Sequence, residues 1–248
     1  MNKWVKGKVI NIKHWTEDIF TLILNAPVNF FIAGQFTKIR LKINKKNIHR
    51  SYSYVNTPKS DHLEFYLISI KTGKLSKYLN ILKKGDIVYL RKESLGSFIL
   101  NNIQSCKNLW MISTGTAIGP YLSILKHKEG INKFEKIILV HSVRLNKEFN
   151  YENKIKILKN KYKNKLLFKK IISREQVYQS ISGRIPLLIY NGILEYSVNL
   201  NINKKNSHVM LCGNPDMIKD TTKILEKFKG MKKNLFKVNG NITTENYW

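Results

Sequence analysis

The chain has 248 residues, 43% of them hydrophobic, which is enough to fill one large domain or two ordinary ones. Its formal net charge is +28, but the excess is even, with 18 basic against 6 acidic residues up to residue 100 and 26 against 10 beyond it. This spread argues against a dedicated nucleic-acid surface, and the two cysteines argue against a zinc cluster or a disulfide framework. The charged N-terminus lacks a signal-peptide core and no apolar run is long enough for a membrane span, so we expect a cytoplasmic protein that binds no membrane. From the charge spread and the cysteine count we also expect that it binds no nucleic acid and no metal.

The first hundred residues predict short strands that are separated by turns. The expected strands are 5–11, 19–25, 35–43, 50–54, 63–70 and 87–91. Regular spacing of short strands is typical of an antiparallel β-barrel. A short helix over 76–82 interrupts them, with Ser76 as its expected N-cap.

From about residue 108 the pattern changes to apolar strands that alternate with helical periods. The strands are expected at 109–112, 137–140, 166–172 and 208–212, and the helices at 119–128, 151–163 and 215–228. Such alternation predicts an α/β domain with a parallel sheet and helices on its faces. The sequence therefore predicts two domains, 1–100 and 101–248.

The segment Arg50-Ser51-Tyr52-Ser53 has side chains suited to a flat, phosphorylated cofactor. In a strand Arg50 and Tyr52 share one face, while the two serines share the other. The phenol offers a stacking surface and the guanidinium a bidentate grip on phosphate. An ordinary half-exposed strand is the alternative for this segment taken alone.

Three glycine-containing turns follow expected strands. The turn 73–76 leads into the short helix, whose free N–H groups suit a pyrophosphate, although a plain turn is the alternative. The segments 113–120 and 212–215 each follow a strand of the second domain and lead into a helix. Two such loops at one edge of a parallel sheet predict a site for an extended ligand.

Arginine is scarce in this chain, with 6 residues against 38 lysines, and lysine replaces it poorly where phosphate is gripped by a planar fork. Arg144, Arg174 and Arg184 lie on successive loops at expected strand ends, where they suit a terminal phosphate. Three unrelated surface charges are the alternative. For Arg40 and Arg91 we expect surface ion pairs.

Together and in this order, the segments resemble the bacterial flavodoxin/ferredoxin–NADP reductase family over essentially the whole chain. The resemblance implies an FAD-binding antiparallel β-barrel at 1–100, followed by an NADP-binding α/β domain at 101–248 whose aromatic C-terminus returns to the flavin. It implies that NADPH gives a hydride to FAD, and that electrons then pass singly to an acidic flavodoxin or ferredoxin. A monomer is expected.

The resemblance also assigns residues. For FAD it implies Arg50, Ser51, Tyr52, Ser53, Leu67, Ile68, Ser69, Lys74, Leu75, Ser76, Thr116, Tyr247 and Trp248. Within this set Tyr52 and Tyr247 lie against the flavin, Trp248 covers the adenine, and Ser53 is the candidate catalytic residue. For NADP(H) it implies Val143, Arg144, Ser173, Arg174, Arg184, Gly213 and Asn214.

Other interpretations remain at this point. The nearest is an NAD(P)H-dependent reductase of free flavin, or another flavoprotein of the same architecture. A remote one is a basic nucleic-acid-binding protein, which would bind DNA in a salt-sensitive way without any flavin.

Overall fold

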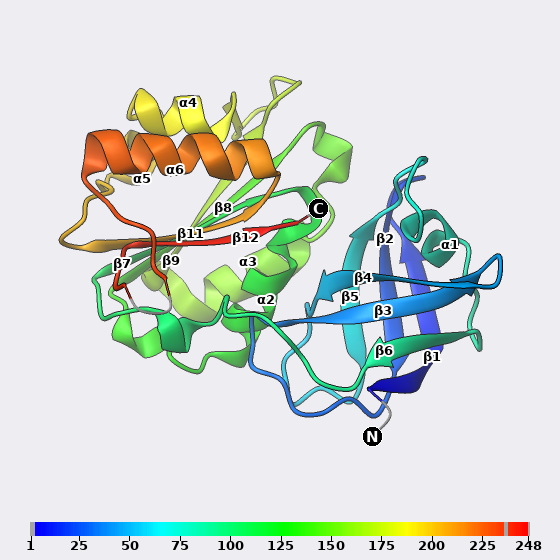
Figure 1. The fold of residues 1–248 in the computed structure, drawn as a ribbon. Coiled ribbons are helices and arrows are strands. Elements are labelled where there is room, and N and C mark those ends of the chain that lie inside the picture. Colours follow the sequence, from blue (N-terminus) through cyan, green and yellow to red (C-terminus); the bar gives the residue numbers. More distant parts are fainter. Residues whose placement is uncertain (1–2, 236–237, 248) are drawn as a thin grey trace. The chain divides into compact units, whose positions relative to one another are not determined.

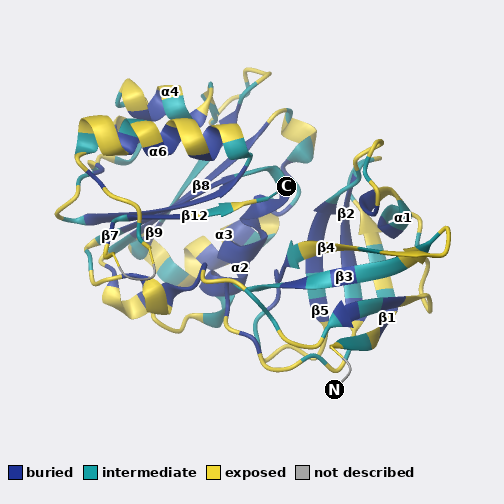
Figure 2. Ribbon diagram, viewed as in Figure 1, coloured by how far each residue is buried: buried dark blue, intermediate teal, exposed yellow. Residues whose placement is uncertain are grey.

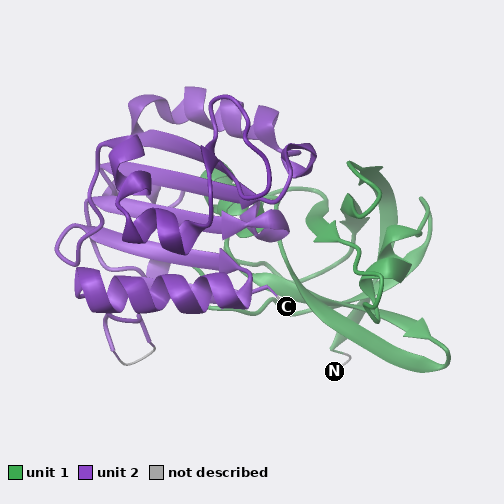
Figure 3. Cartoon of the chain, turned by 90° about the horizontal axis from the view of Figure 1, so that it is seen from above, with its two compact units in different colours: residues 1–99, 119–128 green, residues 100–118, 129–248 purple. Residues whose placement is uncertain are grey.

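A computed structural model describes residues 3–235 and 238–247. The chain divides into two compact units, coloured separately in Figure 3. Unit 1 contains residues 1–99 and 119–128, and unit 2 contains 100–118 and 129–248. Sequence order alone places everything after residue 100 in a second domain, so the grouping of 119–128 with the first hundred residues is a difference from that expectation.

Unit 1 is built on a six-stranded antiparallel sheet with the order β4-β3-β6-β1-β2-β5 (Figure 1). The strands are β1 (Trp4–His14), β2 (Ile19–Asn25), β3 (Phe36–Ile43), β4 (Lys46–Ser53), β5 (Leu63–Ile68) and β6 (Ile87–Arg91), and the one α-helix between β5 and β6 is α1 (Ser76–Asn80). The edges of the sheet meet just beyond β4, where Val55 N–H donates to Glu64 O at 2.9 Å. The expected antiparallel barrel is thereby confirmed.

Strand β4 begins earlier than expected. Asn44 and Lys45 both have positive φ, 48° and 65°, and form the two-residue turn that joins β3 to β4. Turns with two positive φ angles match the twist of paired strands. A hairpin without Gly in its turn was not predicted, so the expected strand started only at residue 50.

Helix α2 (Gly119–His127) belongs to unit 1, and its polar side chains bind the segment where the barrel edges meet. Ser123 Oγ donates to Asn56 O at 2.6 Å, and Lys126 Nζ donates to Val55 O at 3.0 Å. These bonds satisfy two backbone carbonyl groups just beyond the end of β4.

The arginines expected in surface ion pairs behave differently from each other. Arg91 lies 3.9 Å from Glu93, as expected. The guanidinium of Arg40 instead stacks over the Trp4 and Tyr89 rings, 4.4 and 4.8 Å from their centroids. The expectation for Arg40 was therefore wrong, since cross-strand aromatic neighbours provide a cation–π site.

Unit 2 contains a six-stranded parallel sheet with the order β10-β9-β8-β7-β11-β12. Its strands are β7 (Asn108–Thr114), β8 (Lys136–Val143), β9 (Leu166–Ile172), β10 (Ile181–Ser182), β11 (Ser207–Gly213) and β12 (Ile242–Asn246), and its helices are α3 (Glu152–Tyr162), α4 (Ile185–Tyr190), α5 (Ile193–Val198) and α6 (Pro215–Lys229). Helices α4, α5 and α6 cover one face and α3 lies on the other (Figure 1). The expected α/β domain is confirmed, whereas β10, β12, α4 and α5 were not predicted.

The central strands of this sheet are almost entirely buried (Figure 2). Trp110, Ile138 and Leu211 belong to a core that α4 and α6 complete. Strand order reverses between β7 and β11, since β8 to β10 extend to one side of β7 and β11 to the other. In open α/β sheets, ligands bind at the carboxyl ends of the strands where the order reverses.

Among the described residues, no helix combines the length and the apolar character that a membrane crossing requires. In the same part of the chain, no three His, Cys, Asp or Glu side chains gather as metal ligands.

One buried ion pair ties two helices of unit 2 together. Lys229 Nζ, at the end of α6, lies 2.8 and 3.0 Å from the carboxylate oxygens of Glu195 in α5. Glu195 is only 5% exposed, and its Oε1 also accepts the Ile202 N–H at 2.7 Å. The carboxylate therefore depends on these two partners for its buried charge.

Lys229→Met should destabilise unit 2 by about 3 kcal/mol, because it leaves a buried carboxylate without its cation. The measurement is urea-induced unfolding. Lys156→Met is the matched control, since Lys156 pairs with Glu152 on the exposed side of α3 at 3.2 Å. Equal unfolding midpoints for the two variants would contradict the importance assigned to the Glu195 pair.

Candidate functional site

The alternation of β4 divides the segment 50–53 between two sides of the sheet. Arg50 pairs with Ile39 and Tyr52 with Thr37, so both candidates lie on the side of the buried Ile39 side chain. Arg50 is nevertheless exposed and Tyr52 half-buried. The barrel interior thus continues, beside β4, into a surface that carries an arginine and a phenol.

The Tyr52 hydroxyl and the Arg50 guanidinium on this surface are both able to donate hydrogen bonds. Burial raises the pKa of the Tyr52 hydroxyl, and Arg50 offsets only part of that rise, so the phenol is neutral and can donate. Arg50 Nη1 donates to the exposed His49 carbonyl at 2.8 Å, which leaves most of its N–H groups for a ligand. Ser51 is exposed and Ser53 is buried.

The other FAD candidates of unit 1 lie at the end of β5. Strands β4 and β5 contact each other and run antiparallel, so Val55 opposite Glu64 brings Tyr52 toward the segment 67–69. Of this segment Leu67 is buried, while Ile68 and Ser69 are half-exposed. The structure therefore brings two of the predicted segments together within unit 1.

The turn before α1 is held against the same strand end. Ile70 N–H donates to Ser76 Oγ at 3.0 Å, and Gly73 N–H donates to Ile70 O at 2.7 Å. A Cβ on Gly73 would come within 2.8 Å of Ile70 O, so the turn requires glycine. Ser76 is the first residue of α1 and Leu75 its N-cap, which corrects the expected cap: the hydroxyl holds the strand end instead. Lys74 is exposed.

In unit 2 the strand register aligns the expected NADP residues. Val143, Ile172 and Ser182 occupy one row across β8, β9 and β10. The three arginines come one or two residues after this row, at the carboxyl ends of three neighbouring strands. Ser173 N–H donates to Val143 O and Arg174 N–H donates to Arg144 O, both at 3.0 Å.

The guanidinium groups of this row are available for an anion. Arg144, Arg174 and Arg184 are all exposed. Within residues 3–235 and 238–247, none of their side chains has a hydrogen bond or an ion pair. Three guanidinium groups at one sheet edge suit a phosphate monoester, whose three terminal oxygens share up to two negative charges.

The two glycine loops meet where the strand order reverses. Gly213 has φ +137°, a Cβ there would collide with Thr114 Oγ1, and Asn214 N–H donates to that same oxygen at 2.9 Å. Gly115 has φ +56° and no heavy atom within 4 Å of the position that a Cβ would take. A ligand can therefore approach the backbone at Gly115, next to the buried Thr116. The Asn214 side chain accepts the first N–H groups of α6, so its amide oxygen is already bonded.

His141 supports this loop and was missed by the sequence analysis. Its ring is fully buried at the end of β8, and its Nε2 donates to Gly115 O at 2.8 Å. Burial lowers the pKa of His141 to about 4, and nearby Lys170 contributes, so the ring is neutral. A lone histidine in an apolar strand gave no signal of this role, because it depends on contact with a neighbouring strand.

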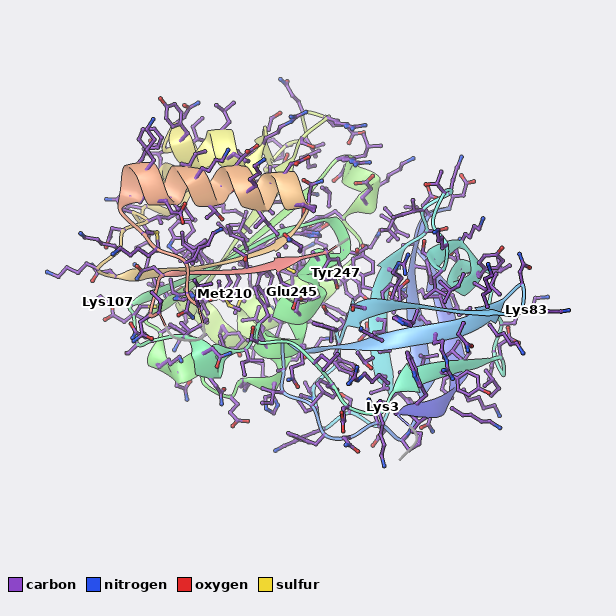
Figure 4. All side chains as sticks on the ribbon, viewed as in Figure 1. Lys3, Lys83, Lys107, Met210, Glu245 and Tyr247 are labelled. Carbon is purple, nitrogen blue, oxygen red and sulfur yellow. The ribbon has the colours of Figure 1, made fainter. Side chains whose placement is uncertain are left out.

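The C-terminal candidates are only partly described. Tyr247 N–H donates to Gly213 O at 3.0 Å, so the chain after β12 stays beside β11. Figure 4 shows Tyr247 at the end of the sheet opposite Lys107, which precedes β7. Trp248 lies outside the described residues.

Burial and Glu245 raise the pKa of the Cys212 thiol, which argues against a nucleophilic role.

Comparison with known proteins agrees with both halves of this geometry. The family model described as the oxidoreductase FAD-binding domain matches residues 7–98, and that of the oxidoreductase NAD-binding domain matches 111–223. Over the full length of both chains, the sequence is 48% identical to the flavodoxin/ferredoxin–NADP reductase of Buchnera aphidicola from Schizaphis graminum and 45% identical to that of Escherichia coli K12. The chain belongs to the flavodoxin/ferredoxin–NADP reductase family.

A solved structure agrees with this membership in the flavodoxin/ferredoxin–NADP reductase family. The ferredoxin NADP+ reductase of Neisseria gonorrhoeae, with bound FAD and NADP, superposes with a TM-score of 0.94 at 29% identity, and each chain covers 100% of the other. In this chain the FAD-binding match precedes the NAD-binding match.

Gly115→Ala should weaken NADP+ binding by about tenfold, equivalent to about 1.4 kcal/mol, because the methyl group occupies the open side of the loop. Gly192→Ala is the matched control, since Gly192 also has positive φ and open space around its Cβ position but follows α4. Both variants should lose about 1–2 kcal/mol of stability. Calorimetry that found equal NADP+ affinity in the two would contradict the site.

The stability of unit 2 should fall as the pH is lowered from 7 to 5. His141 and His208 both have their pKa lowered to about 4 by burial, so the unfolded chain binds protons first, below about pH 6.5. Their stabilising contribution is complete above that pH and is lost as the pH approaches 4. Urea unfolding at several pH values measures it.

His141→Gln tests the assignment, because glutamine keeps an N–H donor without titrating in this range. The variant should show a shallower pH dependence than the natural protein. A natural protein that was equally stable at pH 5 and pH 7 would contradict the lowered pKa values.

Proposed function

We propose that this protein transfers electrons between NADPH and a flavodoxin or ferredoxin, with FAD as its cofactor. Family membership over the whole chain supports the activity. The row of three guanidinium groups, which have no partner among the described residues, is the single observation that supports NADPH rather than NADH, because only NADPH carries a 2′-phosphate on its adenosine ribose.

Unit 1 is proposed to hold FAD. Tyr52 offers its ring to the flavin, Arg50 and Lys74 offer cationic groups to the phosphates, and the backbone of 67–69 meets polar edges. The exposed Arg50 beside a half-buried phenol fits a flat ring joined to a phosphate. Leu75 and Ser76 belong to the same proposal through the turn before α1, and Thr116 is a further proposed FAD contact.

Unit 2 is proposed to hold NADP(H). The 2′-phosphate is bound by Arg144, Arg174 and Arg184. Val143 and Ser173 lie next to these arginines at the ends of β8 and β9. Gly213 and Asn214 lie toward the nicotinamide. The open side of Gly115 fits a ligand that contacts backbone at the carboxyl edge. Tyr247 and Trp248 are proposed to stack on the flavin and adenine rings.

Bound FAD would supply a flavin that accepts a hydride from NADPH and releases electrons one at a time. The chain contributes binding, orientation and charge, because hydride transfer needs no acid or base from the protein. Ser53 is proposed as a weak contributor near the flavin, through a buried hydroxyl that can form a hydrogen bond with the ring.

The electron acceptor is proposed to be acidic. A chain with net charge +28 attracts anionic partners at long range and raises the rate of encounter. We also propose that the protein acts as a cytoplasmic monomer that does not use nucleic acid as a partner.

The purified protein should show flavin absorbance bands, and these should bleach when stoichiometric NADPH is added without oxygen. Adding oxidised flavodoxin or ferredoxin should then restore the bands as the carrier is reduced. Rapid-scan absorbance measures both steps.

Free flavin mononucleotide is the comparison acceptor in this experiment. Faster reoxidation by free flavin than by either protein carrier would favour a free-flavin reductase instead. A colourless protein that also failed to take up added FAD would contradict the proposed function altogether.

A further inference from the structure

Hydrogen bonds join the loop that carries Arg144 to the loop that carries Arg174. Arg174 N–H donates to Arg144 O at 3.0 Å. In the opposite direction, Asn146 N–H donates to Glu175 Oε2 at 2.7 Å. Because Glu175 follows Arg174 directly, the second bond fixes the distance between the points from which the two guanidinium groups extend.

A second carboxylate holds the same loop from its other end. Glu148 Oε2 accepts Arg144 N–H at 3.0 Å and Leu145 N–H at 3.5 Å. Three successive backbone N–H groups, those of residues 144 to 146, are thus bonded to carboxylates. Lys170 Nζ adds a bond of 2.6 Å to Asn146 Oδ1, which ties the loop to β9.

These contacts separate two roles that acidic residues can play beside arginines. A carboxylate near a guanidinium group ordinarily pairs with it and cancels its charge. Here Glu148 and Glu175 bind backbone N–H groups, while within the described ranges the guanidinium groups of Arg144 and Arg174 have no partner. The two carboxylates therefore hold the loops without neutralising the guanidinium groups that the loops carry.

We propose that Glu148 and Glu175 are positioning residues that determine the preference for a 2′-phosphorylated nucleotide. They preorganise the loops that carry Arg144 and Arg174, so that binding of the 2′-phosphate costs little conformational entropy. This inference rests on the proposed function, because it assumes that the three arginines bind the 2′-phosphate of NADPH.

The proposal makes a prediction whose sign is opposite to that of simple electrostatics. Removing a negative charge beside a phosphate site should tighten phosphate binding if only charge matters. Removing a carboxylate that holds the loop should instead weaken phosphate binding. Alanine and glutamine variants separate the effects, since glutamine removes the charge but keeps an oxygen that accepts the backbone N–H.

The experiment measures the affinity of the FAD-loaded protein for 2′,5′-ADP and for 5′-AMP by calorimetry. Glu175→Ala should weaken 2′,5′-ADP binding about tenfold, the equivalent of one charge-assisted hydrogen bond, and leave 5′-AMP binding within about twofold. Glu175→Gln should stay within about threefold of the natural protein. Glu148→Ala should behave as Glu175→Ala does.

Glu135→Ala is the matched control. It removes the same charge at the opposite end of β8, where Glu135 pairs with Lys107 at 3.3 Å on the surface. It should leave the affinity for 2′,5′-ADP unchanged. Thermal unfolding of each variant detects general loss of structure, which would lower the affinity for both nucleotides equally.

Unchanged or tighter binding of 2′,5′-ADP by both alanine variants would overturn the proposal. So would an equal loss of affinity for both nucleotides. If the natural protein itself bound 2′,5′-ADP no more tightly than 5′-AMP, the assignment of the arginines to NADPH would fail first, and this inference with it.

Discussion

The parallel register of the unit 2 sheet is the constraint on which the proposed nucleotide site depends. Val143, Ile172 and Ser182 stand in one row, so the residues beyond them leave the sheet at the same edge. A slip of one residue would turn every side chain of a strand to the other face. Ile138 and Ile171 belong to the apolar core that α4 and α6 complete, so a slip would take each of them out of that core. Core packing thus aligns three arginines that are spread over the chain from residue 144 to residue 184.

The same reasoning applies within unit 1, where the side of the sheet decides what an arginine does. Arg40 points away from the barrel interior and stacks on Trp4 and Tyr89, so it stabilises the outer face. Arg50, on the neighbouring strand, shares the inner side with Ile39 and Tyr52 but remains exposed. Residue type alone does not separate these two arginines, whereas the pairing of β3 with β4 does.

Much of the candidate site could be proposed from the sequence because its signals are local. Three patterns can each be recognised within a few residues of sequence. They are the scarce arginines, the glycines that follow apolar strands, and the alternation of side chains in β4. Strand β12 was missed because Ile242 is its only apolar residue and the rest of its segment is Thr, Glu and Asn. The support from His141 and Glu175 could not be predicted either, since each acts on a loop that follows another strand.

The most direct test of this account is hydrogen–deuterium exchange of the FAD-loaded protein with and without NADP+. Amides at 114–116, 143–146, 173–175 and 213–214 should become protected, because all lie at the carboxyl edge of the unit 2 sheet. Protection confined to the opposite edge, around 102–108 and the start of β12, would contradict the register argument and the site built on it.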